Sequence, residues 1–204
     1  GDDIFLTDGR GGLAQTTISH IGKQKLTLVP KDVVTIPRQK PKITLAFSVL
    51  KQPSRMEWMI EKATEYGVAA FQPLYSEHCI RSHFNSKRLE TIVLSAMKQS
   101  LQCYCPEIHP METFEDFIQK QMTPVRLMAY TPQRLKSPRD TWPKISAMED
   151  ITALVGPEGG FTTKEAEQAE YDALYAFIGQ VLEDNPPEHA PFFAYSESDM
   201  EAST

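Results

Sequence analysis

The stretch Leu154-Val155-Gly156-Pro157-Glu158-Gly159-Gly160-Phe161 is the sharpest local feature of this sequence. It follows an apolar run at residues 151–155 that predicts a buried strand, and it leads into Thr162-Thr163-Lys164-Glu165, which has the form of a helix capping box. Three glycines permit positive φ angles and a close approach of the backbone to a ligand. Several N–H groups can therefore converge on a ligand beside the N-terminus of the helix.

The place of this glycine loop (residues 156–160) after a strand favours a binding site. Open α/β sheets bind ligands just beyond the carboxyl ends of their strands. The loop is not a P-loop, because no Gly-Lys-Ser/Thr follows it. A tight strand-to-helix turn without a ligand would use the same glycines. The loop alone therefore leaves both interpretations open.

Strands and helices alternate in the rest of the chain from residue 41 onward, which predicts an α/β unit with a parallel sheet and right-handed connections. In the predicted strands the apolar residues form continuous runs, which is typical of strands buried on both faces. In the predicted helices they recur every three or four residues. The predicted elements are strands at 43–49, 68–74, 125–130 and 151–155, and helices that start at Pro53 or Ser54, at Asn85 or Ser86, at Phe114 and at the capping box, the last reaching about Phe177.

Residues 1–40 are predicted to form a separate, β-rich unit that ends in a linker. Thirty-six residues are few for a complete barrel, so we expect part of a small β-barrel that lacks a first strand or two. The predicted parts are strands at 3–7, 26–29 and 33–36, a turn at 8–12 and the linker at 38–41.

Composition excludes several classes of protein. With 204 residues, of which 41% are hydrophobic and 24% charged, the chain can bury a core and is not disordered. It holds no apolar run of about 18 residues, so no membrane span is expected. The acidic start lacks the form of a signal peptide. It has no Met, so we expect the chain to begin inside a longer gene product. Three cysteines fit a reducing, cytoplasmic setting.

Charge is divided unevenly along the chain. Residues 165–204 hold ten acidic side chains and no Lys or Arg, so residues 1–164 carry all 21 basic residues against 17 acidic ones, a net charge of +4. Residues 1–164 can therefore bind nucleic acid through local patches, but charge alone favours a solvated surface with an acidic end. Cys103-Tyr104-Cys105 is spaced too closely for a typical metal knuckle, so no metal is expected.

Two further segments carry charge in a regular pattern. In Lys51-Gln52-Pro53-Ser54-Arg55-Met56-Glu57-Trp58-Met59-Ile60-Glu61-Lys62-Ala63-Thr64-Glu65-Tyr66-Gly67, Arg55 and Lys62 lie two helical turns apart. This face could hold phosphates through Arg55 and Lys62, or it could be a solvated helix face with ion pairs. Residues 95–100 predict a helix with Lys98 beside its apolar stripe.

Together these segments resemble the RsmE family of small-subunit ribosomal RNA uridine-N3 methyltransferases, within the SPOUT class. The resemblance covers residues 1 to about 169, and the order and spacing of its segments make it specific. The matching segments are residues 8–12, 51–67, 76–77, 96–100 with Pro106, and 156–161 with Glu165.

The resemblance implies a SPOUT-type trefoil-knotted parallel sheet with helices on both faces, after an N-terminal PUA-like β-barrel. Residues 1–40 would then be a partial, RNA-binding barrel, and residues 41–204 the methyltransferase domain. The family acts as a homodimer, binds S-adenosylmethionine in the knot and methylates a uridine of small-subunit ribosomal RNA. By the same resemblance, the cofactor would contact Ala129, Tyr130, Val155, Gly156, Pro157, Glu158, Gly159 and Gly160, and the RNA would contact Arg10, Lys51, Arg55, Arg81 and Lys98.

The chemistry sets its own demands on the site. Uridine N3 carries a proton, so the transfer needs in-line positioning together with a base, or with a cation that stabilises charge on O2 and O4. Glu158, Lys62 and Glu65 are predicted as the catalytic groups. The sequence does not decide which of them removes the proton and which stabilises the developing charge.

The sequence departs from the family pattern at three places. The family reads Ser-Glu-Arg where this chain has Ser76-Glu77-His78, and it carries a basic residue where this chain has Gln102. Residues 177–184 lack the arginine and threonine of the family's last cofactor loop. A non-catalytic RNA-binding relative that kept the fold is therefore the alternative function.

Overall fold

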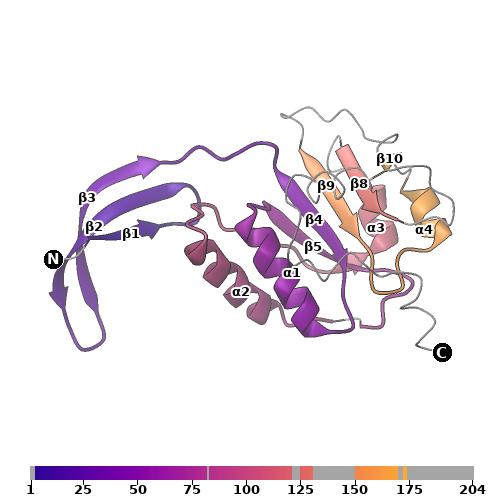
Figure 1. The fold of residues 1–204 in the computed structure, drawn as a ribbon, viewed down its shortest axis with the longest axis horizontal. Coiled ribbons are helices and arrows are strands. Elements are labelled where there is room, and N and C mark those ends of the chain that lie inside the picture. Colours follow the sequence, from indigo (N-terminus) through magenta and orange to yellow (C-terminus); the bar gives the residue numbers. More distant parts are fainter. Residues whose placement is uncertain (1–2, 82, 121–124, 131–149, 170–171, 174–204) are drawn as a thin grey trace, which may run out of the picture.

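The structure is a computed structural model that describes residues 3–81, 83–120, 125–130, 150–169 and 172–173. Strands and helices alternate along most of this part of the chain, as Figure 1 shows. The strands are β1 (Asp3–Thr7), β2 (Gly12–Ile21), β3 (Leu26–Thr35), β4 (Ile43–Ser48), β5 (Ala70–Tyr75), β6 (Glu107–Ile108), β7 (Glu112–Thr113), β8 (Val125–Ala129), β9 (Ile151–Val155) and β10 (Asp172–Ala173). The helices are α1 (Pro53–Glu65), α2 (Ser86–Gln99), α3 (Phe114–Gln119) and α4 (Thr163–Gln168).

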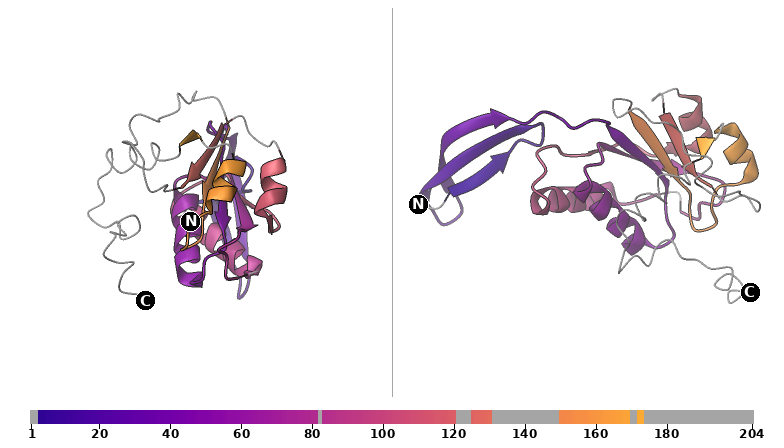
Figure 2. Two further views of the ribbon diagram at one scale, coloured as in Figure 1. Left: turned by 90° about the vertical axis from the view of Figure 1, so that its right-hand side faces the viewer. Right: turned by 45° about the horizontal axis from the view of Figure 1, so that its top comes forward.

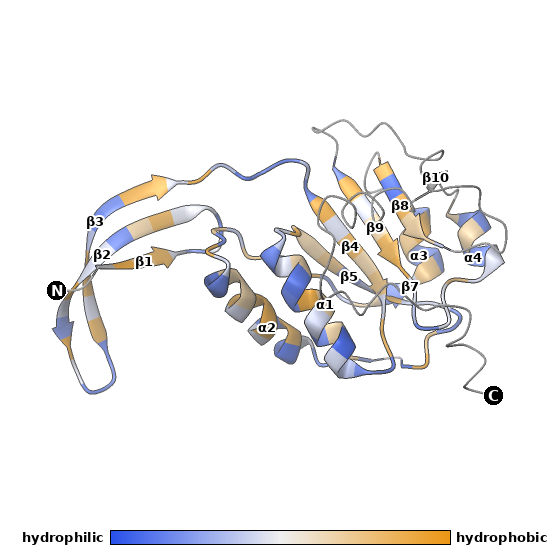
Figure 3. Cartoon of the chain, in the orientation of Figure 1, coloured by the Kyte–Doolittle hydropathy of each residue, from blue (hydrophilic) through white to orange (hydrophobic). Residues whose placement is uncertain are grey.

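A parallel sheet organises the larger part of the chain, which confirms the predicted α/β class. Its strands follow the order β10-β8-β9-β4-β5-β6, and β7 also pairs with β5. All of these pairs are parallel. The central strands β4 and β9 are apolar along most of their length (Figure 3) because helices cover both faces of the sheet.

Two helix pairs pack on opposite faces of the sheet (Figure 2). On β4, Ala46 points to the face covered by α3 and α4, whereas Phe47 points to the face covered by α1 and α2. This alternation follows from the two-residue period of a strand. The first core is completed by Leu74, Phe114, Phe117, Met128, Leu154, Phe161 and Ala166, and the second by Val49, Met56, Ile60, Phe71, Leu89 and Val93.

The N-terminal residues form a three-stranded antiparallel sheet in the order β1-β2-β3. Strand β2 was not predicted, because its polar and apolar residues give only a weak alternating pattern. Two strands separated at Pro30 were predicted in place of β3. The structure shows one strand instead, since β3 is an edge strand and the register shifts between Gln15 and Thr16, where Thr16 lies opposite Pro30.

Backbone hydrogen bonds join this sheet to the segment that follows α2. The N–H of Gly11 donates to the carbonyl of Cys103 at 3.0 Å, and the N–H of Cys105 donates to the carbonyl of Gly9 at 2.8 Å. The Tyr104 hydroxyl donates to the carbonyl of Ile36 at 2.9 Å. The cysteines of the Cys-Tyr-Cys segment therefore lie at the junction between the N-terminal sheet and the α/β part.

The last predicted helix is shorter than expected. Helix α4 ends at Gln168 rather than near Phe177, and Asp172–Ala173 pairs in parallel with β8 as β10. The pairing of residues 172–173 with β8 outweighs the helix propensity of this Ala- and Glu-rich segment. In the part of the chain that the structure describes, no helix has the length and apolar character of a membrane span.

Helix α2 ends in a turn that requires a left-handed residue. Gln102 N–H donates to the carbonyl of Met97, and Leu101 N–H donates to the carbonyl of Lys98, as in a Schellman motif. Leu101 takes the left-handed position with φ 57°, and its side chain is 85% exposed. Glycine is the usual residue there because a Cβ is strained at this φ.

Replacing Leu101 with glycine should therefore stabilise the protein. We expect L101G to raise the free energy of unfolding by about 1 kcal/mol, since it removes the left-handed strain and loses almost no burial. Urea denaturation followed by circular dichroism measures the change. The matched control is L94G within α2, which should lower the free energy of unfolding by about 1 kcal/mol. Equal destabilisation by both substitutions would contradict this account of the turn.

Candidate functional site

The topology of the sheet places the glycine loop at a switch point. From β4 the chain crosses through α1 to β5 on one side, whereas β9 leads through α4 toward β10 on the other. Strands β4 and β9 are neighbours, so the loops after them diverge from adjacent carboxyl ends. Ligands of open α/β sheets bind outside the sheet at this position.

Glu158 joins the two diverging loops. Its carboxylate oxygens accept a hydrogen bond from the backbone N–H of Lys51, at 3.1 and 3.2 Å. Lys51 follows β4 and precedes α1, while Glu158 lies at the exposed tip of the glycine loop. The predicted catalytic carboxylate therefore also fixes the spacing of the loops across the switch point.

Glu165 holds the glycine loop against the loop that follows β5. Its side chain is buried, with 2% exposure, and it accepts from the N–H of Glu77 at 2.8 Å. Its other oxygen accepts from the N–H of Thr162 at 2.8 Å, while its own N–H donates to the Thr162 hydroxyl, which completes the predicted capping box. The Glu165 carboxylate thus binds the backbone just after the glycine loop, caps α4 and anchors the loop after β5.

The loop after β5 is fixed on both sides of His78. The hydroxyls of Ser76 and Ser48 share a buried hydrogen bond of 2.7 Å at the ends of β5 and β4. The Cys79 thiol is buried and donates to the carbonyl of Val49 at 3.1 Å. His78 Nδ1 lies 3.1 Å from the carbonyl oxygen of Gly159 and 3.2 Å from that of Gly160.

The glycines differ in what surrounds them. A Cβ on Gly156 would lie 3.0 Å from the carbonyl carbon of Gly160 and 3.0 Å from the nitrogen of Phe161, both backbone atoms. Gly160 has φ +69°, but a Cβ there would meet nothing within 4 Å. Its N–H donates to the carbonyl of Pro157 at 2.8 Å and closes the turn. Gly156 therefore lets the glycine loop pack closely against its own backbone.

The remaining predicted cofactor residues lie on the strands next to the loop. Val155 is the last residue of β9 and pairs with Ala129, the last residue of β8. Tyr130 follows directly, and its hydroxyl lies 3.0 Å from that of Thr163, in the first turn of α4. The structure therefore brings together the whole predicted cofactor set: Ala129, Tyr130, Val155, Gly156, Pro157, Glu158, Gly159 and Gly160.

The predicted RNA-binding cations fall into two groups. Lys51, Arg55 and Arg81 lie at the carboxyl edge of the sheet, in or next to the loops after β4 and β5. Lys98 lies in the last turn of α2, and Arg10 bridges to Tyr104 beyond that helix. The first group flanks the glycine loop, and the second lies at the junction with the N-terminal sheet.

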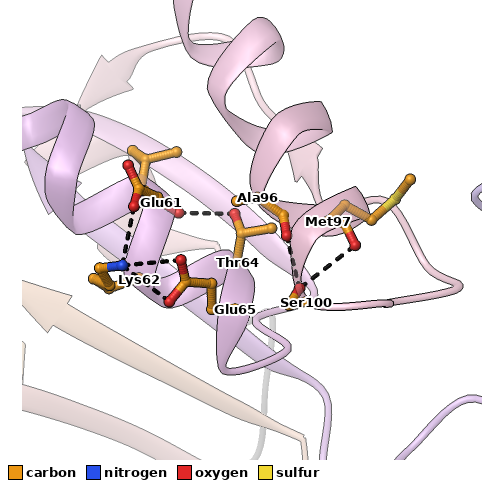
Figure 4. Close-up of polar contacts among 8 residues, drawn as sticks. Glu61, Lys62, Thr64, Glu65, Ala96, Met97 and Ser100 are labelled. Atoms are coloured by element: carbon orange, nitrogen blue, oxygen red, sulfur yellow. Dashed lines mark hydrogen bonds and ion pairs between the residues drawn. The ribbon is translucent and has the colours of Figure 1, made fainter.

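Lys62 and Glu65 lie in the last turn of α1, where they bind each other (Figure 4). The Lys62 ammonium is 2.9 Å from Glu65 and 2.9 Å from Glu61. The Glu65 carboxylate, followed by that of Glu61, holds the pKa of Lys62 above its ordinary value. Lys62 lies nine positions after Pro53 along the helix, a rise of about 14 Å. The structure does not bring this pair to the glycine loop, so its catalytic role stays a prediction.

His78 is the site residue that the sequence analysis did not assign. No local spacing indicates it, because its contact with the glycine loop spans 81 residues of sequence. The only signal was its place in the Ser76-Glu77-His78 departure from the family pattern. Among the described residues, no cluster of three or more His, Cys, Asp or Glu side chains is suited to a metal ion.

The sequence matches a known family over most of the α/β part. A model of the RNA methyltransferase domain matches residues 38–177. A Rickettsia conorii protein named ribosomal RNA small subunit methyltransferase E is 33% identical over 168 residues, covering 81% of this chain and 67% of its own length. The chain belongs to the RsmE family of RNA methyltransferases. A Synechocystis member of the same name is 31% identical over 174 residues, covering 83% of this chain but only 56% of its own length.

Solved structures of methyltransferases share the fold of this chain. A structure described as a probable rRNA-methyltransferase from Porphyromonas gingivalis has a TM-score of 0.77 and 29% identity, covering 90% of this chain and 84% of its own. A methyltransferase from Legionella pneumophila, solved with S-adenosylmethionine bound, has a TM-score of 0.71 and 25% identity, covering 83% of this chain and 71% of its own. The parallel sheet with helices on both faces therefore matches the arrangement in rRNA methyltransferase structures.

Removing the Glu165 carboxylate should destabilise the site and the fold together. E165A leaves the N–H groups of Glu77 and Thr162 without their acceptor, so we expect the free energy of unfolding to fall by about 2–4 kcal/mol. Urea denaturation measures this loss. E167A, an exposed substitution in the same helix, is the control and should change stability by less than about 0.5 kcal/mol. A similar small effect for both variants would show that Glu165 does not tie these loops together.

Proposed function

We propose that this chain transfers a methyl group from S-adenosylmethionine to N3 of a uridine in small-subunit ribosomal RNA. The observation that carries the proposal is the glycine loop at the β4–β9 switch point, in a chain that belongs to the RsmE family. The names of its relatives supply the RNA class, and the Legionella structure contains the methyl donor. The chain spans 56–67% of the length of the two curated relatives compared, so the activity of the complete protein is part of the proposal.

The cofactor site is the backbone around the glycine loop. Gly156 keeps its backbone free of a Cβ where Gly160 and Phe161 approach it. Backbone N–H and C=O groups at the ends of β8 and β9 would bind the polar edges of the nucleoside, with Ala129, Tyr130 and Val155 on one side. Bound S-adenosylmethionine supplies a methyl group on a positively charged sulfur.

The protein must position the uridine and assist removal of the proton from N3. Glu158 is the predicted carboxylate at the loop, where it could act as a base or orient the substrate. Its contact with the Lys51 N–H engages both oxygens, so substrate binding would have to share or replace that hydrogen bond. The catalytic roles of Lys62 and Glu65 stay predictions. Both residues lie at the end of α1, so the substrate would have to extend to that end of the helix to contact them.

Three cations support RNA binding at the carboxyl edge of the sheet. Lys51 and Arg81 are exposed and Arg55 is half-buried, and all three lie in or beside loops that the Glu158 and Glu165 contacts position. Phosphate contacts of this kind add affinity without reading sequence. Arg10 and Lys98 would extend the contact to the junction with the N-terminal sheet.

We also propose three features of the family for the complete protein. The glycine loop and β10 would belong to a trefoil knot, and the N-terminal sheet would be part of a PUA-like barrel that contacts RNA. Two copies would form a homodimer. Because its substrate is ribosomal RNA, the protein would act in the cytoplasm.

Cofactor binding to two variants tests the proposal. Calorimetry with S-adenosylhomocysteine should show binding to the unaltered chain and none to G156A, whose new methyl group meets the backbone of Gly160 and Phe161. E167A, an exposed substitution in α4 outside the predicted cofactor set, is the control and should bind like the unaltered chain. Loss of binding in neither variant would remove the glycine loop as the cofactor site.

A methyl-transfer assay separates the enzyme from a non-catalytic relative. The chain, incubated with labelled S-adenosylmethionine and small ribosomal subunits that lack the modification, should transfer label to N3 of a uridine. Mass spectrometry of nuclease digests identifies the position. Salt-dependent binding of RNA without transfer would instead support the alternative, a relative that kept the fold and lost the activity.

A further inference from the structure

His78 contacts the glycine loop from a rigid support. It lies three residues beyond the end of β5, between two residues that are held to other parts of the site. On one side the N–H of Glu77 donates to the buried Glu165 carboxylate, and on the other the thiol of Cys79 donates to the carbonyl of Val49. The imidazole therefore meets the loop from a backbone that has little freedom to move away.

The contact requires a hydrogen-bond donor. Nδ1 lies 3.1 and 3.2 Å from the carbonyl oxygens of Gly159 and Gly160, and carbonyl oxygens only accept. The Nδ1 atom must therefore carry a proton, which it does in one neutral tautomer and in the imidazolium ion. Both forms can hold the loop.

The fit at Gly159 is close as well as polar. A Cβ on Gly159 would lie 3.2 Å from Cβ of His78 and 3.3 Å from its Nδ1. His78 is itself exposed, so its contacts are with the loop rather than with a core. Its removal should change the loop and leave the fold intact.

We propose that His78 is the positioning residue that holds the carbonyls of Gly159 and Gly160 in the cofactor-binding arrangement. The inference rests on the proposed function, because it assigns the glycine loop to the cofactor.

The test measures cofactor affinity for three variants. H78A removes the donor, and we expect the Kd for S-adenosylhomocysteine to rise about tenfold, as the loss of one or two hydrogen bonds implies. H78N places an amide N–H where Nδ1 lies, so it should restore affinity to within about twofold of the unaltered chain. H83A, which changes another exposed histidine, should bind like the unaltered chain. Urea denaturation of all three should give the same midpoint.

The outcomes separate this inference from the proposed function. If the unaltered chain binds S-adenosylhomocysteine and H78A binds it equally well, the positioning role is wrong and the proposed function stands. If H78A keeps cofactor affinity but needs more RNA for half-maximal methyl transfer, His78 is an RNA contact and the inference is also wrong. Failure of H78N to restore affinity would contradict it as well. If the unaltered chain binds no cofactor at all, the proposed function and the inference both fail.

Discussion

The arrangement of the site depends on the buried carboxylate of Glu165. Three donors around it, the N–H groups of Glu77 and Thr162 and the Thr162 hydroxyl, offset the cost of removing a charged group from water. The N-terminus of α4 adds a favourable dipole. Because one oxygen binds the loop after β5 and the other binds the end of the glycine loop, neither loop can move without breaking a partly buried hydrogen bond.

Around that contact, three loops from three neighbouring strands become one unit. Glu158 ties the glycine loop to the loop after β4, and the hydroxyls of Ser48 and Ser76 tie the ends of β4 and β5. His78, in the loop after β5, adds a contact with the carbonyl of Gly159 in the glycine loop. These contacts all lie at the carboxyl edge of a parallel sheet, at its switch point, where ligands of open α/β sheets bind. Preorganised backbone groups bind a ligand without the cost of ordering a flexible loop.

Local signals in the sequence were sufficient for most elements of the α/β part. The capping box at Thr162 and Glu165, the apolar run of β9 and the start of α2 after Asn85 depend on residues a few positions apart. Contacts between distant residues were not predictable in this way. Glu165 meets Glu77 across 88 residues, and His78 meets Gly159 across 81. Helical spacing grouped Lys62 with Arg55 on one face, but it could not say which end of α1 meets the glycine loop. The strand β2 was missed because its pairing with β1 and β3 decides its conformation.

Amide hydrogen exchange of the glycine loop tests the central claim most directly. With saturating S-adenosylhomocysteine, the N–H groups of Gly156, Gly159 and Gly160 should exchange at least about tenfold more slowly, since the account makes this backbone the binding surface for the nucleoside. Amides of the N-terminal sheet, such as those of β2, should exchange at an unchanged rate. Unchanged exchange in the glycine loop, with protection elsewhere in the chain, would contradict the account.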